Sequence, residues 1–570
     1  MLQSAWNLFS TKLKLLRSIT GASQASGSIP VIVPVPAPLH RPLRATPPSI
    51  LAAVEGHWAG CFLLALLWFA ATAWLRPLAI PDEGRYVGVA REMLLRGDWL
   101  VPTLNGAPFF HKPPLFYWLT AASMQLLGTD VLAARLASIL AAAAVTTGLF
   151  VYLRRWADPI RARWAVIVLA STPLFFGGAQ YANLDMLVAA CIGGAVLCAA
   201  HALNSRDAGQ RYRVALASAF AVAALGVLAK GLIGAVVPVL VLLSWGLLTG
   251  RLMRTLTLLS WAPGVLLFFC LAAPWFIEMQ ARFPGFDHYF FVVQHFERFA
   301  STGFNNSQPI WFYPVVLGAL MLPWSPWLLA LRRRSYWSQP DPSHTRSLMA
   351  AWVVVVVCFF SMPSSKLIGY ILPALPPLGF LVADAMRHIA LLRQLDERNP
   401  RVRSNALRAR ELSVAVAILV CVGAVIAAHF AQPKSMRVLA QHLEAARHPD
   451  EPVIFVDSYY YDVAFYAHLN APVRVVDLWL PAELAKDSWR RELFDAVAFA
   501  PAATRLQLMH PADLPPMLCS VPGAWVVGPI AAASRYAPLG TLTAVYTTDQ
   551  TALWHVVTRP ADALGCARAE

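Results

Sequence analysis

The chain has few charged residues for its length. Of its 570 residues only 14% are Asp, Glu, Lys or Arg, against about a quarter in an ordinary soluble protein. This shortage excludes a protein that is soluble over its whole length, and the hydrophobic share of 58% excludes intrinsic disorder, which requires low hydrophobicity. The mean hydropathy of +0.54 therefore predicts many membrane spans and a smaller soluble part.

Cysteine is also scarce, with eight residues in the chain. Six of them lie inside apolar runs, where cysteine behaves as a small hydrophobic residue rather than as part of a metal cluster. The other two, Cys519 and Cys566, lie in the more polar last segment. A disulfide between them is one hypothesis if that segment lies in an oxidising compartment.

Acidic residues are outnumbered by basic ones, 31 against 46, which gives a formal net charge of +15. In a soluble protein this excess would favour a nucleic-acid partner, but no nucleic-acid-binding motif accompanies it. In a membrane protein the same excess is typical of cytoplasmic loops. We therefore expect no nucleic acid among the partners. The sequence also shows no glycine-rich nucleotide-binding loop.

The first 57 residues have the character of a tail. A Pro-rich run over 30–48 follows a weakly amphipathic stretch, without the order of charged, apolar and small residues that a cleavable signal peptide shows. We expect residues 1–57 to form a Pro-rich cytoplasmic extension.

Eleven apolar runs are long enough to cross a bilayer as helices, which takes about 17 to 25 residues each. If the tail is cytoplasmic, alternation places every strongly basic loop on the cytoplasmic face, as the positive-inside rule requires. The sequence predicts an α-helical polytopic membrane protein with about 11–13 transmembrane helices, its transmembrane domain spanning 58–431. The runs are 58–76, 131–153, 163–181, 184–203, 213–229, 231–249, 255–276, 309–330, 347–362, 367–385 and 411–431.

The last segment, 432–570, is more polar than the rest. Short strand-like apolar runs at 452–456 and 473–476 alternate with a helix-like stretch at 438–446. This pattern predicts a small α/β domain of roughly 130 residues. Alternation of the apolar runs places it on the outer face, which is the periplasm in a bacterium that has one.

Acidic residues collect on the predicted outer face. Asp82 and Glu83 directly follow the first run, Tyr86 stands close behind them, and Asp185 lies at the outer mouth of a later run. An acid with apolar sequence on both sides costs a few kcal/mol in the membrane and marks a candidate functional site by default. For Asp82 and Glu83 the alternative is a helix start, because acids favour the first helical turn.

Cations come from separate outer segments. His111 and Lys112 precede a double proline, and Lys230 joins two apolar runs. For His111 and Lys112 the alternative is an aromatic anchor with a snorkelling lysine. Lys and Arg can stabilise a leaving phosphate, and a carboxylate can take a proton from an attacking hydroxyl, so the mixture favours glycosyl or phosphoryl transfer from a lipid phosphate. The other outer candidates are His288, His295, Arg298, Lys366 and Tyr370.

Together these residues resemble a known family, the bacterial aminoarabinose lipid A transferases, which belong to the protein mannosyltransferase-like, C-type glycosyltransferase superfamily. The resemblance implies an inverting enzyme of the bacterial inner membrane. It would move a sugar from undecaprenyl phosphate to lipid A, or to a related envelope glycolipid, at the periplasmic face. The matching motifs, in order, are Asp82-Glu83, Lys112-Pro113-Pro114-Leu115, Asp185, Lys230-Gly231, 295–299 and Ser365-Lys366-Leu367 with Tyr370.

The resemblance also implies residue roles. Asp82 and Asp185 would orient the acceptor and the sugar, with Glu83 as a third catalytic candidate and Lys112 paired to Asp82. The expected donor or phosphate ligands are Lys112, Lys230, Arg298, Lys366 and Tyr370, and the expected substrate contacts are Tyr86, His111 and His295.

One position departs from the family pattern. A Glu usually precedes the Lys-Pro-Pro run, whereas this chain has His111 there. The change weakens the inference that the donor carries an amino sugar. His111 with His288 or His295 could instead bind a divalent metal; no other cofactor is expected.

Three other functions stay open as hypotheses. Transfer to a protein Ser or Thr hydroxyl would need a general base more than transfer to an ionised phosphate does. A transporter of lipid-linked sugars commonly shows internal repeats and charges at the bilayer midplane, and the sequence displays neither. A purely structural scaffold is disfavoured, since charges in a membrane are costly to keep without use.

Overall fold

The computed structural model describes residues 57–297, 306–394, 400–431, 435–536 and 540–558. The expected cytoplasmic tail therefore lies outside the described residues, apart from its last residue. Cys566 and the side chain of Cys519 lie outside them as well, so the disulfide stays a prediction.

The described chain is a multi-pass helical protein, as the sequence predicts, and each of the eleven apolar runs contains helix. Among the described residues, six helical segments are long and apolar enough to span a membrane, or up to eight if each of two bent pairs is one span. The six are α6 (Val131–Trp156), α9 (Leu184–Asp207), α10 (Arg213–Lys230), α13 (Ala262–Arg282), Ile368–Ala390, which joins η3 (Ile368–Ala374) to most of α18 (Leu375–Gln394), and Arg408–Phe430 in α19 (Pro400–Phe430). The shorter apolar helices are α3 (Trp58–Ala70), α5 (Leu115–Leu127), α11 (Ile233–Leu248) and α17 (Thr345–Ser361).

Prolines break three of the predicted runs. A proline lacks the N–H that would continue a helix, so the chain bends or restarts beside it. Proline stands in the first turn of α8 (Pro173–Ala179), and the preceding α7 (Pro159–Ala170) is bent from it by 68°. A proline also stands in the first turn of α13, which follows α12 (Leu252–Leu259). A further proline opens η2 (Ser325–Arg332), which is bent by 118° from α15 (Phe312–Leu320).

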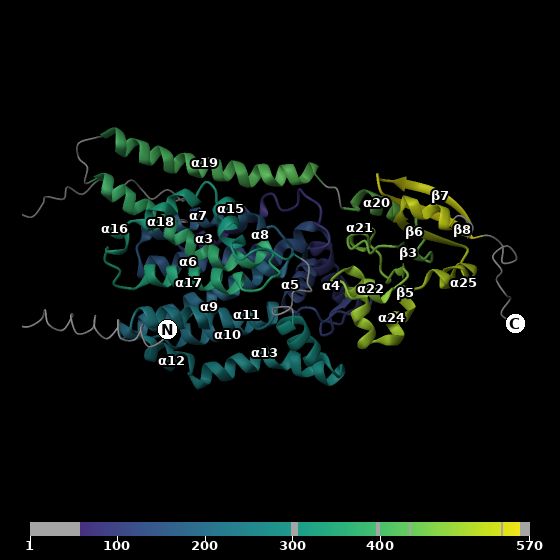
Figure 1. Ribbon diagram of the computed structural model, residues 1–570, viewed down its shortest axis with the longest axis horizontal. Helices are drawn as coiled ribbons and strands as arrows, with labels where there is room; N and C mark the ends of the chain where they lie inside the picture. Colours follow the sequence, from purple (N-terminus) through teal and green to yellow (C-terminus); the bar gives the residue numbers. More distant parts are fainter. Residues whose placement is uncertain (1–56, 298–305, 395–399, 432–434, 537–539, 559–570) are drawn as a thin grey trace, which may run out of the picture. The chain divides into compact units, whose positions relative to one another are not determined.

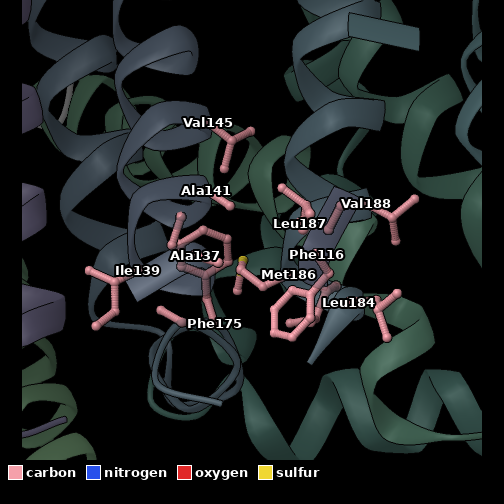
Figure 2. Close-up of a cluster of buried hydrophobic side chains, with 14 of the residues drawn as sticks. Phe116, Ala137, Ile139, Ala141, Val145, Phe175, Leu184, Met186, Leu187 and Val188 are labelled. Atoms are coloured by element: carbon pink, nitrogen blue, oxygen red, sulfur yellow. The ribbon is translucent and has the colours of Figure 1, made fainter. Parts of the chain in front are cut away.

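Helix α9 packs against α6, α10 and α11, with 78% of its most apolar stretch buried inside the protein. Figure 2 shows Met186, in the first turn of α9, in a cluster with Phe116 of α5, Ala137 of α6 and Phe175 of α8. Close-packed interiors resist displacement of any member. The cluster therefore holds the first turn of α9, where Asp185 stands, in a defined position.

The segment between α3 and α5, here named the outer segment after its predicted location, contains α4 (Asp82–Arg96) and a hairpin of β1 (Thr103–Leu104) and β2 (Ala107–Pro108). The two hairpin residues Asn105 and Gly106 have positive φ of 53° and 74°, which suits the Asn-Gly pair of a tight hairpin turn. The Asn105 amide then bonds the backbone of Val473 twice, donating at 3.0 Å and accepting at 2.8 Å. The outer segment is thereby fastened to the C-terminal part of the chain.

The C-terminal part is an α/β unit, as expected. Its sheet has the order β5-β4-β3-β6-β8-β7, with parallel pairing up to β6 and antiparallel pairing for β8 and β7, and it is drawn in green to yellow in Figure 1. The expected helix is α20 (Arg437–Ala446). The strands are β3 (Val453–Val456), β4 (Arg474–Val476), β5 (Leu508–Met509), β6 (Gly523–Pro529), β7 (Gly540–Thr547) and β8 (Thr551–Thr558).

Chain segments that follow the parallel strands reach the outer ends of the membrane helices. Tyr461 lies five residues beyond the end of β3, and α23 (Trp489–Phe494) comes in the connection after β4. In open α/β sheets, ligands bind outside the carboxyl ends of the parallel strands. We therefore expect functional residues at this edge of the sheet.

Candidate active site

Two cavities meet at one end of the helices, the end that the sequence predicts to be the outer one. The polar cavity, of about 520 Å³, is bordered by charged side chains of the membrane helices, of the outer segment and of the C-terminal unit. The apolar cavity, of about 550 Å³, lies among the side chains of α8, α15 and η3 (Ile368–Ala374), with Lys366 at its edge. Residues that line both are Asp82, Asn183, Asp185, Asn306 and Leu367. The two carboxylates thus stand where the cavities join.

The structure brings most of the expected site residues together. Glu83 and His288 line neither cavity, and Lys366 lines the apolar one. Arg298 and the side chain of His295 lie outside the described residues. The expected residues around the polar cavity are Asp82, Tyr86, His111, Lys112, Asp185, Lys230 and Tyr370.

Asp185 stands in the first turn of α9. The Asn183 side chain caps this helix by accepting a hydrogen bond of 2.6 Å from the Asp185 backbone N–H. A carboxylate is favoured there by the positive end of the helix dipole. Its Oδ1 forms an ion pair with the ammonium of Lys230, which lies 4.2 Å from the centroid of the Tyr370 ring. Three residues that are distant in the sequence thereby form one unit.

Asp82 begins α4 and faces both signs of charge. Its Oδ1 lies 3.1 Å from Nη1 of Arg85, and Nε of the same guanidinium lies 2.6 Å from Oε1 of Glu492. Burial raises the pKa of Asp82, the nearby Arg85 opposes that rise, and the negative charges of Asp185 and Glu492 add to it. A carboxylate whose pKa is raised accepts a proton more readily, which suits a group beside an attacking oxygen.

Glu83 has a different environment from its neighbour Asp82, because its side chain is fully buried. Arg135 binds it through two bonds of 2.8 Å, and Arg76 approaches to 2.5 Å. The backbone N–H of Ala182 donates to it at 2.7 Å. Since Ala182 leads directly into the first turn of α9, Glu83 fixes the relative placement of Asp82 and Asp185. These contacts favour a positioning part for Glu83, and the catalytic part expected from the sequence stays a prediction.

His111 meets a carboxylate of the C-terminal unit. Its Nε2 lies 3.4 Å from Oδ2 of Asp495, and the hydroxyl of Tyr289 donates to the same oxygen at 2.7 Å. Burial alone would raise the pKa of Asp495, but these two neighbours outweigh it and lower that pKa. His288 is exposed. Within the described part of the chain no group of three or more His, Cys, Asp or Glu side chains could hold a metal ion.

Lys366 is held by the backbone of two paired segments. The backbone N–H groups of Lys366 and Gln308 each bond across to the other segment at 3.0 Å. The ammonium of Lys366 then donates to the carbonyl oxygens of Gln308 at 2.7 Å and Pro363 at 2.5 Å. This cation is thereby fixed at the edge of the apolar cavity.

Sequence reasoning missed the contribution of the C-terminal unit. Its residues contribute one wall of the polar cavity, and no local motif announces them. The fold brings residues 461 and 487–495 next to α4. The sequence feature that could have indicated their part in the site is their position after predicted parallel strands. The residues concerned are Tyr461, Asp487, Ser488, Trp489, Arg491, Glu492 and Asp495.

Comparisons with known proteins show which proteins the chain resembles. The family model "Dolichyl-phosphate-mannose-protein mannosyltransferase" matches residues 111–277. The undecaprenyl phosphate-α-4-amino-4-deoxy-L-arabinose arabinosyl transferase of Aeromonas salmonicida is 35% identical over 347 residues, 60% of this chain and 62% of that protein. The transferase of the same name from Aeromonas hydrophila is 34% identical over 334 residues, 58% of this chain and 59% of that protein.

The fold also resembles that of a solved structure. The crystal structure of ArnT from Cupriavidus metallidurans bound to undecaprenyl phosphate matches with a TM-score of 0.71 at 23% identity, and the match covers 87% of this chain and 98% of that one. The chain resembles the aminoarabinose transferases. The resemblance inferred from the motifs of the sequence is thus confirmed, and the sequence match spans about three fifths of these transferases' own length.

Proposed function

We propose that the chain is an integral-membrane glycosyltransferase. It moves a sugar, 4-amino-4-deoxy-L-arabinose, from undecaprenyl phosphate to lipid A or a related envelope glycolipid, at the periplasmic face of the bacterial inner membrane. The observation that carries the proposal is the meeting of an apolar and a polar cavity at Asp82 and Asp185. A lipid-linked donor and a phosphorylated acceptor require such a pair of compartments. The similarity to transferases named for this donor supports the choice of sugar.

The apolar cavity suits the donor lipid. Its walls come from membrane helices, where an isoprenoid chain gains the same burial as it does in lipid. Lys366 at its edge and Lys230 beyond Asp185 offer cations for the phosphate. Their charge would stabilise the phosphate as it leaves. The sugar then reaches the two carboxylates.

The polar cavity suits the phosphorylated head of the acceptor, because Arg85, Lys112 and Arg491 line it. An acceptor phosphate oxygen forms the new bond to the anomeric carbon as the bond between that carbon and the donor phosphate oxygen breaks. The leaving undecaprenyl phosphate keeps the electron pair. Where the acceptor oxygen carries a proton, Asp82 takes it. All of this chemistry uses side chains and needs no nucleotide.

The division of the chain fits this function. We propose a transmembrane transferase domain over 58–431 and a periplasmic α/β domain over 432–570, preceded by the tail over 1–57. The two domains share the polar cavity, so the periplasmic domain forms part of the site.

Transport of the lipid-linked sugar is less well supported. A transporter places its charges near the bilayer midplane, whereas Asp185 and Lys230 stand at the first and last turns of their helices. Transfer to a protein hydroxyl has the description of the matching family model in its favour, and the experiment below separates it from transfer to lipid A.

The test compares envelope lipids from a deletion strain that carries the wild-type chain or the double variant Asp82→Asn, Asp185→Asn. Mass spectrometry should find the sugar on lipid A only with the wild type, and purified wild-type protein should transfer it from undecaprenyl phosphate-aminoarabinose in detergent. Sugar found on envelope proteins in place of lipid A would contradict the proposed acceptor. An unchanged envelope in both strains would contradict transfer itself.

A further inference from the structure

The guanidinium of Arg85 lies between two carboxylates of different origin. Asp82, one turn earlier on α4, meets its Nη1 at 3.1 Å. Glu492, from α23 of the periplasmic α/β unit, meets its Nε at the shorter distance of 2.6 Å. The three groups border the polar cavity. A cation with two anionic neighbours neutralises neither of them fully, because its charge is divided between them.

Glu492 is itself held in place. The hydroxyl of Tyr461 donates to its other oxygen, Oε2, and the Tyr461 ring lies under the Arg85 guanidinium, 5.3 Å from centroid to Cζ. The close approach of Tyr461 to α4 depends on Gly84, where an added Cβ would stand 2.8 Å from the Tyr461 Cβ. The side chain of Glu492 is therefore an oriented anion that the periplasmic unit places against α4. Glu492 is buried, with only 8% of its surface exposed.

We propose that Glu492 is a positioning residue of the transfer reaction, which holds Arg85 away from full pairing with Asp82 and so keeps the Asp82 carboxylate available to the acceptor. This inference rests on the proposed transferase function. Without the charge of Glu492, the planar fork of Arg85 turns both of its N–H edges to Asp82, since a bidentate pair is the stronger arrangement. Asp82 is then occupied and less basic.

The titratable side chains of Tyr86 and Tyr181 interact electrostatically with Asp82. Charged groups on the surrounding elements shift the pKa of Asp82. They are Arg85 on α4, Asp185 on α9, Lys230 on α10 and Glu492 on α23. The two anions among them raise the pKa of Asp82, and the two cations lower it. Removal of the Glu492 charge therefore lowers the pKa of Asp82, and the acidic limb of a pH-rate profile governed by Asp82 moves to lower pH.

The experiment compares the purified full-length wild type with Glu492→Gln, Glu492→Asp and Tyr461→Phe, using undecaprenyl phosphate-aminoarabinose and lipid A in detergent. The matched control is Glu483→Gln, an exposed acid of the same unit paired with Lys486. We expect kcat of Glu492→Gln to fall about tenfold with a KM within about twofold of the wild type. The acidic limb of the pH-rate profile of Glu492→Gln should lie at lower pH than that of the wild type. Glu492→Asp should keep the pH-rate profile of the wild type and show an intermediate kcat. Tyr461→Phe, which leaves both charges in place, should show a smaller fall in kcat.

A second readout needs no turnover. The carboxyl band of Asp82, identified by its loss in Asp82→Asn, should titrate at lower pH in Glu492→Gln than in the wild type when followed by difference infrared spectroscopy. An unchanged titration or a rise in KM alone overturns the positioning role, and so does an effect equal to that of Glu483→Gln. If the wild type transfers no sugar while the band still shifts, the proposed function fails and the coupling of Glu492 to Asp82 stands.

Discussion

Both ends of the helical bundle bury ion pairs, but the two ends differ in what surrounds the charges. At the end opposite the cavities, Asp384 is 3% exposed and lies 2.9 Å from Arg161 and 2.8 Å from Arg346. It lines neither of the two cavities described above. Asp185 has a similar low exposure, 7%, yet it borders both of them. Both ends thus contain a buried, paired acid. What distinguishes a candidate functional acid from a structural one is whether it borders a cavity.

The same contrast separates two neighbours in the sequence. Asp82 borders both cavities, whereas two arginines and backbone N–H groups surround Glu83. The comparison teaches that a buried charge in a membrane protein becomes a functional candidate when a ligand can reach it. A buried charge without such access holds elements together. Each of the following substitutions tests this distinction.

The largest effect is expected for Asp185→Asn. Removal of this charge takes the carboxylate partner away from Lys230 and removes one of the two carboxylates that line both cavities. We expect the turnover rate to fall by about 10³-fold, which corresponds to roughly 4 kcal/mol of lost transition-state stabilisation. Water in the cavities can solvate the freed ammonium, so Tm in detergent should change by only a few degrees.

Asp384→Asn is the matched control at the opposite end. It leaves two arginines without their shared partner in a place with no described cavity, and removing one member of a buried pair costs about 3–5 kcal/mol. Tm should fall by many degrees, while the molecules that stay folded keep their turnover rate. If Asp384→Asn lowered the turnover of folded protein as much as Asp185→Asn does, the distinction between the two ends would be refuted.

Glu83→Gln should act on stability. Burial alone would raise the pKa of Glu83, but Arg135 and Arg76 outweigh it and lower that pKa from 4.5 to about 2. A lowered pKa means that the carboxylate stabilises the fold fully above its ordinary pKa and loses this contribution as pH falls toward about 2. The shift corresponds to about 3 kcal/mol. The Tm difference between wild type and variant should therefore be large at neutral pH and shrink on acidification; a difference independent of pH would contradict the ion cluster.

Gly369→Ala tests how tightly the site is packed. An added Cβ at this position would overlap the Asp185 carboxylate, which would have to move away from Lys230. Since a misplaced catalytic group can cost about 10²-fold in rate, we expect a fall of between about tenfold and 10²-fold in the transfer rate. The control is Gly318→Ala in α15, where an added Cβ has no neighbour within 4 Å. Equal rates for the two variants would exclude a close contact at Asp185.

Glu483→Gln should have the smallest effect. This exposed acid pairs with Lys486 three residues away at 2.6 Å, and exposed pairs contribute little to stability because water and salt screen their charges. Tm and turnover should both stay close to those of the wild type. A substantial loss of either would show that α22 (Pro481–Leu484) participates in the site, contrary to its place outside the cavities.

Much of the fold could be predicted from the sequence because its causes are local. Hydrophobic runs of membrane-spanning length predict helices whatever surrounds them, and each of the runs contains helix. The short strands 453–456 and 474–476 with helix 437–446 follow from periodicity and polarity within a few residues. The bends after Ala170 and Leu320 were missed, because prolines in an apolar run leave the mean hydropathy high while they interrupt the helix.

The candidate site divides along the same line. Asp82, Asp185 and Lys230 could be found because charges stand out where apolar residues surround them in the sequence. Glu492 and Asp495 stand among ordinary polar residues of the C-terminal unit, so no local contrast reveals them. The sequence predicts the same catalytic role for Glu83 as for Asp82, because two adjacent acids have the same charge and the same neighbouring sequence. Their opposite surroundings arise from the helical turn, which directs consecutive side chains to different sides.

Hydropathy and charge along the chain are enough to predict that this protein crosses the membrane many times, that an α/β unit follows the last span, and that acids and cations gather at one end. The three-dimensional fold is needed to learn which carboxylates border the cavities, which are enclosed by arginines, and that Glu492 of the C-terminal unit contacts Arg85. These distinctions depend on contacts between residues far apart in the chain, and such contacts leave no pattern in either segment alone.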